Sequence, residues 1–212
     1  MSESSVSKTN PSGWLRALGK NDLPASFILN GETFKHLRTF KHDFFAGTGL
    51  YEGNSDRVVL KIGRQAGAFG IPLSFIGKFL ARREMRLLNA TAGLEGIPKC
   101  LGAIMRTGLV RRFVDGAPVS KDSKLDDNFF PRLSKLLDEI HARDMAYVDL
   151  EKRENILLGE DGRPYLIDFQ ISWKIDGWMG RTWPAKWMLG VLQLGPIPPD
   201  EALASASPRS AR

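Results

Sequence analysis

The sequence predicts an α+β fold that is divided into two lobes. A strand-rich region with one helix occupies residues 34–114, and a helix followed by a hairpin occupies residues 128–168. The chain has 212 residues, which is long enough for one sizeable core or two small lobes. Its two ends are rich in Ser, Pro and Ala, a composition typical of segments outside a core.

These patterns divide the chain into four parts. We expect residues 1–29 to form an N-terminal extension that is partly disordered, and residues 196–212 to form a disordered tail. Residues 30–114 are expected to form an N-lobe, with an antiparallel sheet and one helix. Residues 115–195 are expected to form a reduced C-lobe, with a cleft between the two lobes.

The N-lobe strands are indicated by β-branched and aromatic runs that turns separate. These runs are FKHLRTF, FFAGTGLYEG and RVVLKIG, and a Gly-Asn-Ser-Asp turn joins the last two. A helix is predicted over residues 74–89, because Ser74 is a suitable N-cap and follows Pro72. The apolar stripe predicted for this helix consists of Ile76, Phe79, Leu80, Leu87 and Leu88.

Glu84 lies on the same predicted stripe, one helical turn after Leu80 and one before Leu87. A lone carboxylate on an apolar helix face is costly unless it is paired. We therefore expect a cation on the neighbouring sheet to be its partner.

The rest of the chain adds two strands, a helix and a hairpin. GIPKCLGAI and TGLVRRFV read as strands, and DGAP turns the chain away from the sheet. NILL and PYLIDF flank Glu-Asp-Gly-Arg, which is a hairpin signal. The helix is predicted over residues 128–141, because apolar residues recur there at helical spacing. These residues are Phe129, Leu133, Leu136, Leu137 and Ile140.

Composition restricts the classes of function. The net charge of +6 and the sequence pI near 9.5 favour acidic partners such as nucleotide phosphates, phospholipids or anionic glycans. No zinc-ligand spacing or nucleic-acid-binding motif accompanies the charge, so nucleic acid is not the expected partner. The N-terminus lacks the apolar region of a secretory signal, no apolar run is long enough to span a membrane, and Cys100 is the single cysteine. We therefore expect a cytoplasmic location.

Five polar residues follow one another in the order that phosphoryl transfer from a nucleotide requires. Lys61 lies in VVLK, Glu84 lies on the next helix, Asp149 and Asn155 flank a polar loop, and Asp168 ends a strand. The reaction needs a cation on the phosphates, a group that holds this cation, carboxylate and amide ligands for Mg²⁺, and a carboxylate at the acceptor hydroxyl. Each residue alone has a plainer explanation, such as a turn residue for the aspartates or an edge-strand charge for Lys61.

The set resembles the protein-kinase-like superfamily, and it is closest to the small atypical members (RIO-like and lipopolysaccharide-core kinases). IHARDMAYVDL matches the family's catalytic loop, ENILL its Asn-Ile-Leu-Leu segment and LIDFQ its Asp-Phe-Gly segment. VVLK stands where Val-Ala-Ile-Lys would, and LVRRFVDGAPV resembles the hinge. The resemblance covers residues 39–171 and implies a two-lobed kinase-like fold that uses ATP and Mg²⁺.

The resemblance also implies a role for each matched residue. Asp149 becomes the catalytic aspartate, and Lys152 the loop lysine that reaches the transferred phosphate. Asn155 and Asp168 become the magnesium ligands.

Three further roles concern the nucleotide. Lys61 and Glu84 become an ion pair on its phosphates. The hinge backbone around Arg112, Phe113 and Val114 would face the adenine.

Three interpretations of the activity stay open. The first is a kinase for hydroxyl groups, with a protein Ser/Thr acceptor preferred. The second is a kinase for a lipid-linked sugar at a membrane, since the segment from Trp173 to Trp187 combines tryptophans with basic residues. The third is a pseudokinase that binds nucleotide or a partner.

The pseudokinase interpretation depends on departures from the family pattern. The loop from Asp149 to Asn155 has one residue more than usual, and Gln170 follows Asp-Phe in place of glycine. The expected phosphate-covering turn, KHDFFAGT, offers Lys41 and His42 instead of a glycine-rich loop.

Overall fold

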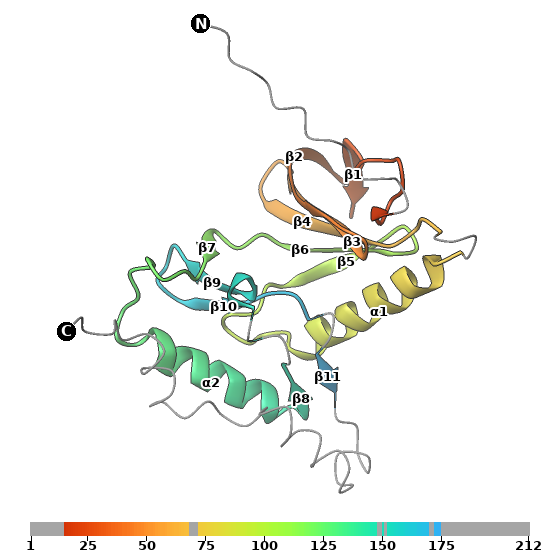
Figure 1. The fold of residues 1–212 in the computed structure, drawn as a ribbon. Helices are drawn as coiled ribbons and strands as arrows, with labels where there is room; N and C mark the ends of the chain where they lie inside the picture. Colours follow the sequence, from red (N-terminus) through yellow and green to blue (C-terminus); the bar gives the residue numbers. More distant parts are fainter. Residues whose placement is uncertain (1–14, 68–71, 148–149, 151, 170–171, 175–212) are drawn as a thin grey trace, which may run out of the picture. The chain divides into compact units, whose positions relative to one another are not determined.

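The computed structural model describes residues 15–67, 72–147, 150, 152–169 and 172–174. The described chain is a mixed α+β structure with a curled antiparallel sheet and few helices (Figure 1), so the predicted α+β class is confirmed. The helices are α1 (Ser74–Ala90), α2 (Phe129–His141) and the short 3₁₀ helix η2 (Arg153–Asn155). The strands are β1 (Ser26–Leu29), β2 (Glu32–His42), β3 (Ala46–Glu52), β4 (Arg57–Gly63), β5 (Cys100–Ile104), β6 (Gly108–Arg112), β7 (Gly116–Pro118), β8 (Met145–Ala146), β9 (Ile156–Gly159), β10 (Pro164–Leu166) and β11 (Trp173–Lys174).

The backbone divides into two compact units. The first consists of Met1–Arg82 and Leu101–Arg112, and the second consists of Arg83–Cys100 and Phe113–Arg212. The boundary passes through α1, whose second half groups with the C-terminal part of the chain.

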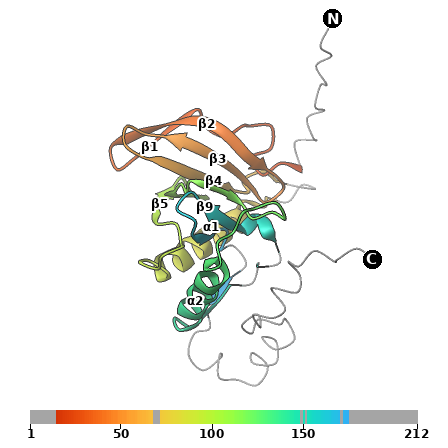
Figure 2. The ribbon, with the colours of Figure 1, turned by 90° about the vertical axis from the view of Figure 1, so that its left-hand side faces the viewer.

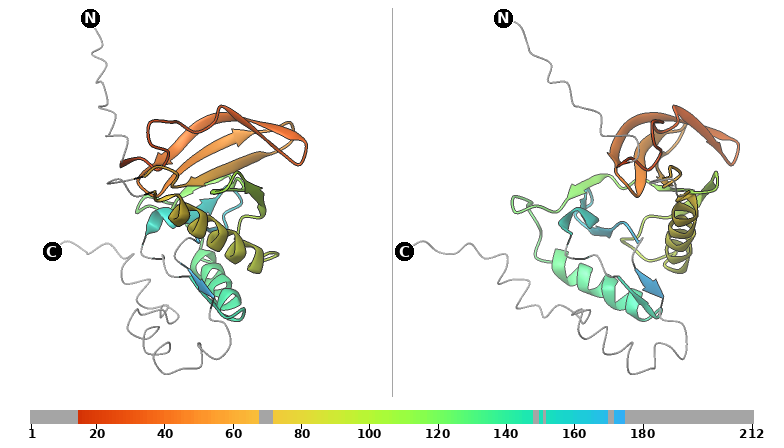
Figure 3. Two further views of the ribbon diagram at one scale, coloured as in Figure 1. Left: turned by 90° about the vertical axis from the view of Figure 1, so that its right-hand side faces the viewer. Right: turned by 45° about the vertical axis from the view of Figure 1, so that its right-hand side comes forward.

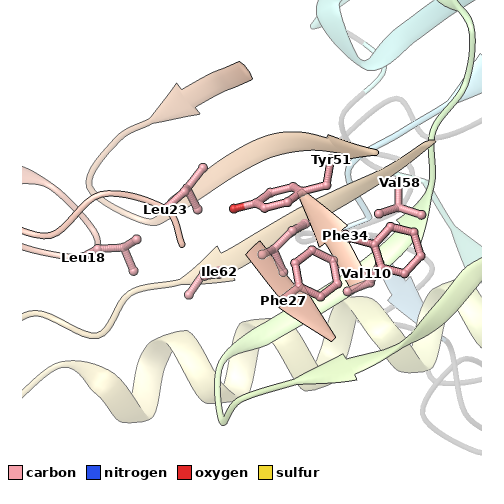
Figure 4. Close-up of a cluster of buried hydrophobic side chains, with 9 residues drawn as sticks. Leu18, Leu23, Phe27, Phe34, Tyr51, Val58, Ile62 and Val110 are labelled. Atoms are coloured by element: carbon pink, nitrogen blue, oxygen red, sulfur yellow. The ribbon is translucent and has the colours of Figure 1, made fainter. Parts of the chain in front are cut away.

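A six-stranded sheet with the order β1-β2-β3-β4-β6-β5 dominates the first unit. Figure 2 shows how β1 to β4 curl around one another. The register shifts at two places in the β2–β3 pairing, and such bulges increase the local twist of a strand. One face of the curled sheet encloses an apolar core (Figure 4).

That core joins the strands to the segment that precedes them. Phe27 stacks on Phe34 with ring centroids 5.3 Å apart and meets Tyr51 edge-on at 4.9 Å. Burial raises the pKa of Tyr51 to about 12, and its hydroxyl donates a 2.7 Å hydrogen bond to the Pro24 carbonyl. The remaining members of the core are Leu18, Leu23, Val58, Leu60, Ile62 and Val110.

The N-terminal segment is therefore more structured than its composition predicts. We expected residues 1–29 to be an extension outside the N-lobe, but Ser26–Leu29 form β1 and pair with β2. Leu18 and Leu23 are buried in the core as well. The signal in the sequence was weak, because SFIL holds only three apolar residues after Ser26, with no period that marks them as a strand.

The first half of α1 lies directly on the end of β4. A Cβ atom added to Gly77 would lie 2.1 Å from the Arg64 carbonyl oxygen, and one added to Gly63 would lie 2.8 Å from the Gly77 carbonyl oxygen. Glycine at both positions thus allows the two backbones to touch, which a side chain would prevent.

The buried face of α1 differs from the predicted stripe. Glu84, Leu87 and Leu88 are buried as expected, but the Phe79 side chain is 62% exposed. The helix turns its Gly77 and Glu84 face inward, and Phe79 lies roughly 140° away from Glu84 around the axis. Backbone contact at Gly77, which hydrophobicity does not encode, selects this face.

In the second unit, α2 packs beside the β9–β10 hairpin, and β7 completes a three-stranded sheet with the order β10-β9-β7. Figure 3 shows α2 and the short pair of β8 and β11. The predicted inner face of α2 is confirmed, since all five of its apolar residues are buried.

Residues 83–100 join the second unit through backbone carbonyls. Arg143 donates hydrogen bonds to the carbonyls of Ala90 (2.8 Å) and Ala92 (3.0 Å). Leu166 N donates to the Gly96 carbonyl at 2.9 Å, so β10 is held along its outer edge. Neither α1 nor α2, the two α-helices in the described part, has the length and apolar composition that crossing a bilayer requires.

We predict that Gly77→Ala destabilises the protein, although alanine is normally the better helix former by about 1 kcal/mol. The new methyl group would overlap the Arg64 backbone, and overpacking of this kind typically costs about 1–3 kcal/mol. Urea unfolding followed by circular dichroism measures the change. Asn89→Ala, at an exposed position of the same helix, is the control and should be neutral or stabilising; a Gly77→Ala protein as stable as wild type would contradict the contact.

Candidate functional site

Two of the predicted site residues come together at one end of the β9–β10 hairpin. Asn155 ends η2 and immediately precedes β9, and Asp168 follows β10 by two residues. The hairpin pairs Leu166 with Ile156, and the next hydrogen bond runs from Ile167 N to the Asn155 carbonyl at 2.9 Å. The chain therefore brings the Asn155 and Ile167–Asp168 backbones to the same hairpin end. The Asn155 side chain is buried there, and Asp168 is half-buried.

Asp168 has a left-handed backbone, with φ at 66°. Residues other than glycine rarely adopt this conformation, although aspartate and asparagine tolerate it best. Such a conformation persists only where the surrounding structure holds it, and it often marks a functional position.

Tyr147 supplies part of that surrounding structure. Its hydroxyl donates a hydrogen bond to the Ile167 carbonyl, and its ring meets Phe169 edge-on with centroids 5.0 Å apart. Both rings are almost completely buried. Tyr147 thus contacts the residues immediately before and after Asp168.

The structure describes only some of the other residues predicted for the catalytic loop. Asp149 and Gln170 lie outside the described residues. Lys152 is exposed at the start of η2, and its carbonyl accepts a 2.8 Å hydrogen bond from Asn155 N. Across the described ranges, no group of three or more His, Cys, Asp or Glu side chains could hold a metal ion.

Lys61 and Glu84 each occupy the predicted element. Lys61 is half-buried in β4, opposite Thr48 of β3 and Leu109 of β6. Glu84 is buried on α1, with 2% of its surface exposed. Lys61 belongs to the first unit and Glu84 to the second, so their ion pair stays a prediction.

The predicted hinge coincides with a change of unit. Arg112 ends β6 in the first unit, where its guanidinium pairs with Asp56 at 2.8 Å. Phe113 and buried Val114 begin the next stretch of the second unit. The expectation that this backbone faces adenine stays a prediction.

The turn between β2 and β3 differs from a phosphate-covering loop. The Asp43 carboxylate accepts hydrogen bonds from the amides of Phe45 (2.8 Å) and Ala46 (2.9 Å). Lys41 pairs with the same carboxylate at 2.9 Å. Burial alone would raise the pKa of Asp43, but Lys41 and the two amides lower it below its usual value. The backbone amides of Phe45 and Ala46, which could donate to a bound phosphate, therefore donate to the protein's own Asp43 carboxylate.

His42, the second residue expected to be available on this turn, faces two N–H donors. Its Nδ1 atom lies 2.7 Å from Arg16 Nη2, and its Nε2 atom lies 3.3 Å from Leu18 N. Burial and the Arg16 charge lower the pKa of His42. Lys41 and His42 are thus both engaged within the protein, and the expectation that they serve a bound phosphate stays a prediction.

Sequence reasoning missed the parts played by Tyr147 and Asp43. Nothing in the segment IHARDMAYVDL indicates that the Tyr147 hydroxyl bonds the Ile167 carbonyl, twenty positions further along the chain. Asp43 could have been found from its position two residues before Phe45, because aspartate commonly accepts the amide two residues further on in a turn.

We predict that His42 makes stability fall as the pH falls below about 6.5, the value for an unperturbed histidine. Because the pKa of His42 is lowered in the folded state, the unfolded state binds the proton at a higher pH than the folded state does. The free energy of unfolding therefore decreases as the pH falls from about 6.5 to the lower pKa of the folded state. His42→Gln should flatten the pH dependence of the urea midpoint between about pH 7 and pH 5. His36→Gln is the control, and an equally flat profile from it would contradict the assignment.

We also predict that Tyr147→Phe lowers stability by about 1 kcal/mol, because the Ile167 carbonyl loses its donor while the Phe169 contact remains. Tyr165→Phe is a matched control, since that hydroxyl bonds Asp161 at an exposed turn and should contribute less. Equal effects in urea unfolding would argue against the importance of the Ile167 bond.

Comparison with known proteins identifies no relative of this chain. No protein-family model matches the chain, and no curated protein matches its sequence.

Proposed function

We propose that the chain is an ATP- and Mg²⁺-dependent phosphotransferase with a two-lobed, protein-kinase-like fold, which moves the γ-phosphate to a hydroxyl group. The observation that supports it best is the hairpin end at which the Asn155 and Ile167–Asp168 backbones meet. Asn155 carries an amide oxygen and Asp168 a carboxylate. The two residues are thirteen positions apart in sequence, yet both lie at this end of the hairpin.

The donor set there suits Mg²⁺. Asn155 offers an amide oxygen and Asp168 a carboxylate, which are the hard ligands that this ion prefers. Mg²⁺ keeps several waters and takes the rest of its shell from nucleotide phosphates, so it does not require a cluster of three acidic or histidine side chains. When bound, the ion would neutralise charge on the phosphates.

The residues of the chain have distinct parts in the proposal. Asp168 and Asn155 bind the ion, and the left-handed backbone of Asp168 sets the direction of its carboxylate. Asp149 orients the acceptor hydroxyl and takes up its proton, and Lys152 places a positive charge beside the transferred phosphate. Positioning and electrostatics supply most of the acceleration in such a reaction.

The acceptor is proposed to be a Ser/Thr hydroxyl of a protein. A second candidate function is nucleotide binding without turnover, as in a pseudokinase. It is favoured by one observation: the amides of Phe45 and Ala46 already bind the Asp43 carboxylate. The β2–β3 turn thus holds a negative charge at the place where a phosphate-covering loop would offer free backbone N–H donors.

The decisive experiment compares two aspartates that share the left-handed backbone. Asp168→Asn keeps the shape and tolerance for this conformation but removes the charge, so we expect loss of γ-phosphate turnover on the order of a hundredfold or more. Asp144→Asn is the control, because Asp144 also has positive φ, at 56°, but lies three residues after the end of α2 and matches none of the residues assigned to the proposed site.

Thermal shifts with Mg²⁺ and ATP separate the two candidate functions. A wild-type shift together with turnover that Asp168→Asn and Asp149→Ala abolish would support the phosphotransferase. A wild-type shift without turnover would support the pseudokinase. The kinase-like assignment fails if neither is observed, or if Asp144→Asn loses as much activity as Asp168→Asn.

A further inference from the structure

Two large aromatic side chains are exposed on the first half of α1. Phe75 and Phe79 are each 62% exposed, which is high for phenylalanine. They are four residues apart and therefore neighbours on one helix face. Gly77, between them in sequence, points to the opposite side and touches β4.

Two cations share that face. At about 100° per residue, Phe75, Lys78, Phe79 and Arg82 fall within an arc of roughly 100°. We call these four residues the α1 stripe; all belong to the first unit. Arg82 is exposed and Lys78 is half-buried, so the Lys78 stem can lie along the rings while its amine reaches solvent.

The charges of the α1 stripe are not neutralised within the described chain. No acidic residue occurs in α1 before Glu84, which is buried on the other face. Neither Lys78 nor Arg82 forms an ion pair with any residue that the structure describes. The stripe therefore joins exposed apolar rings to uncompensated positive charge.

We propose that the α1 stripe docks on the surface of an anionic phospholipid bilayer. Phe75 and Phe79 enter the boundary between headgroups and acyl chains, and Lys78 and Arg82 contact lipid phosphates. Aromatic residues beside basic ones on one helix face have the composition of an interfacial helix. Positive charges near an anionic membrane strengthen binding through attraction to the lipid phosphates.

A bilayer fits this face better than a partner helix does. The apolar part of the stripe spans a single turn, from Phe75 to Phe79, and then gives way to Arg82. A helix-pairing seam needs apolar residues that recur over several turns. A short pair of rings on a convex helix suits a deformable surface, and the net charge of +6 adds long-range attraction.

The test is co-sedimentation of the full chain with phosphatidylcholine vesicles that either contain or lack phosphatidylserine. We expect binding only to the anionic vesicles, and weaker binding at high salt because exposed charges are screened. Phe75→Ser/Phe79→Ser should reduce the partition coefficient by about tenfold or more. Lys78→Glu/Arg82→Glu should reduce it by a similar factor of about ten.

The matched control removes exposed apolar side chains elsewhere in the same unit. Ile28 and Leu37 are 67% and 48% exposed on β1 and β2, and Ile28→Thr/Leu37→Thr should bind as wild type does. All variants should keep the wild-type melting temperature and the wild-type thermal shift with Mg²⁺ and ATP. This separates loss of docking from loss of folding or of the proposed activity.

A probe on the stripe reports insertion directly. Phe79→Cys in a Cys100→Ser background, labelled with an environment-sensitive dye, should shift its emission to the blue on anionic vesicles only. Absence of wild-type binding, equal binding to both vesicle types, or undiminished binding of both stripe variants would overturn the proposal. Capture of an acidic peptide by the stripe without vesicle binding would also overturn it, in favour of a protein partner.

Discussion

The register of the β9–β10 hairpin is the constraint on which the candidate site depends. Ile156 faces Leu166, so the next residues outward, Asn155 and Ile167, meet through a 2.9 Å hydrogen bond. Because side chains alternate along a strand, a slip of one residue would reverse the direction of every side chain in the hairpin. The bond from Leu166 N to the Gly96 carbonyl fixes the outer edge of β10 and opposes such a slip.

A second constraint acts in the first unit, where backbone lies against backbone. Gly77 lets α1 approach Arg64 so closely that no side chain fits between them. Arg64 itself is buried and donates a 2.7 Å hydrogen bond to the Phe44 carbonyl, with its guanidinium 3.7 Å from the Phe44 ring centroid. Helix, strand end and β2–β3 turn are thus linked, and Asp43 closes the turn with an internal negative charge.

The elements with strong periodicity were predictable. The inner face of α2 follows from apolar residues at helical spacing, and β4 follows from its continuous run of β-branched and apolar residues, which is buried on both faces of the strand. The inner face of α1 followed only in part, since Glu84, Leu87 and Leu88 are buried as predicted but Phe79 is exposed. Hydrophobic pattern gives no weight to a glycine contact, and a glycine contact orients this helix. β1 was missed for a related reason, because its burial depends on pairing with β2 rather than on its own pattern.

The sequence alone determined the α+β class, most element positions and the identity of the polar residues proposed to carry chemistry. Only the tertiary structure decided which of them share one place: the Asn155 carbonyl accepts a hydrogen bond from Ile167 N, the residue before Asp168, and the Tyr147 hydroxyl donates to the Ile167 carbonyl. It also decided that Lys41 and His42 are engaged by Asp43 and Arg16. The physical reason is that spacing along a chain restricts secondary structure, whereas hydrogen-bond partners and exposed faces depend on contacts between distant segments.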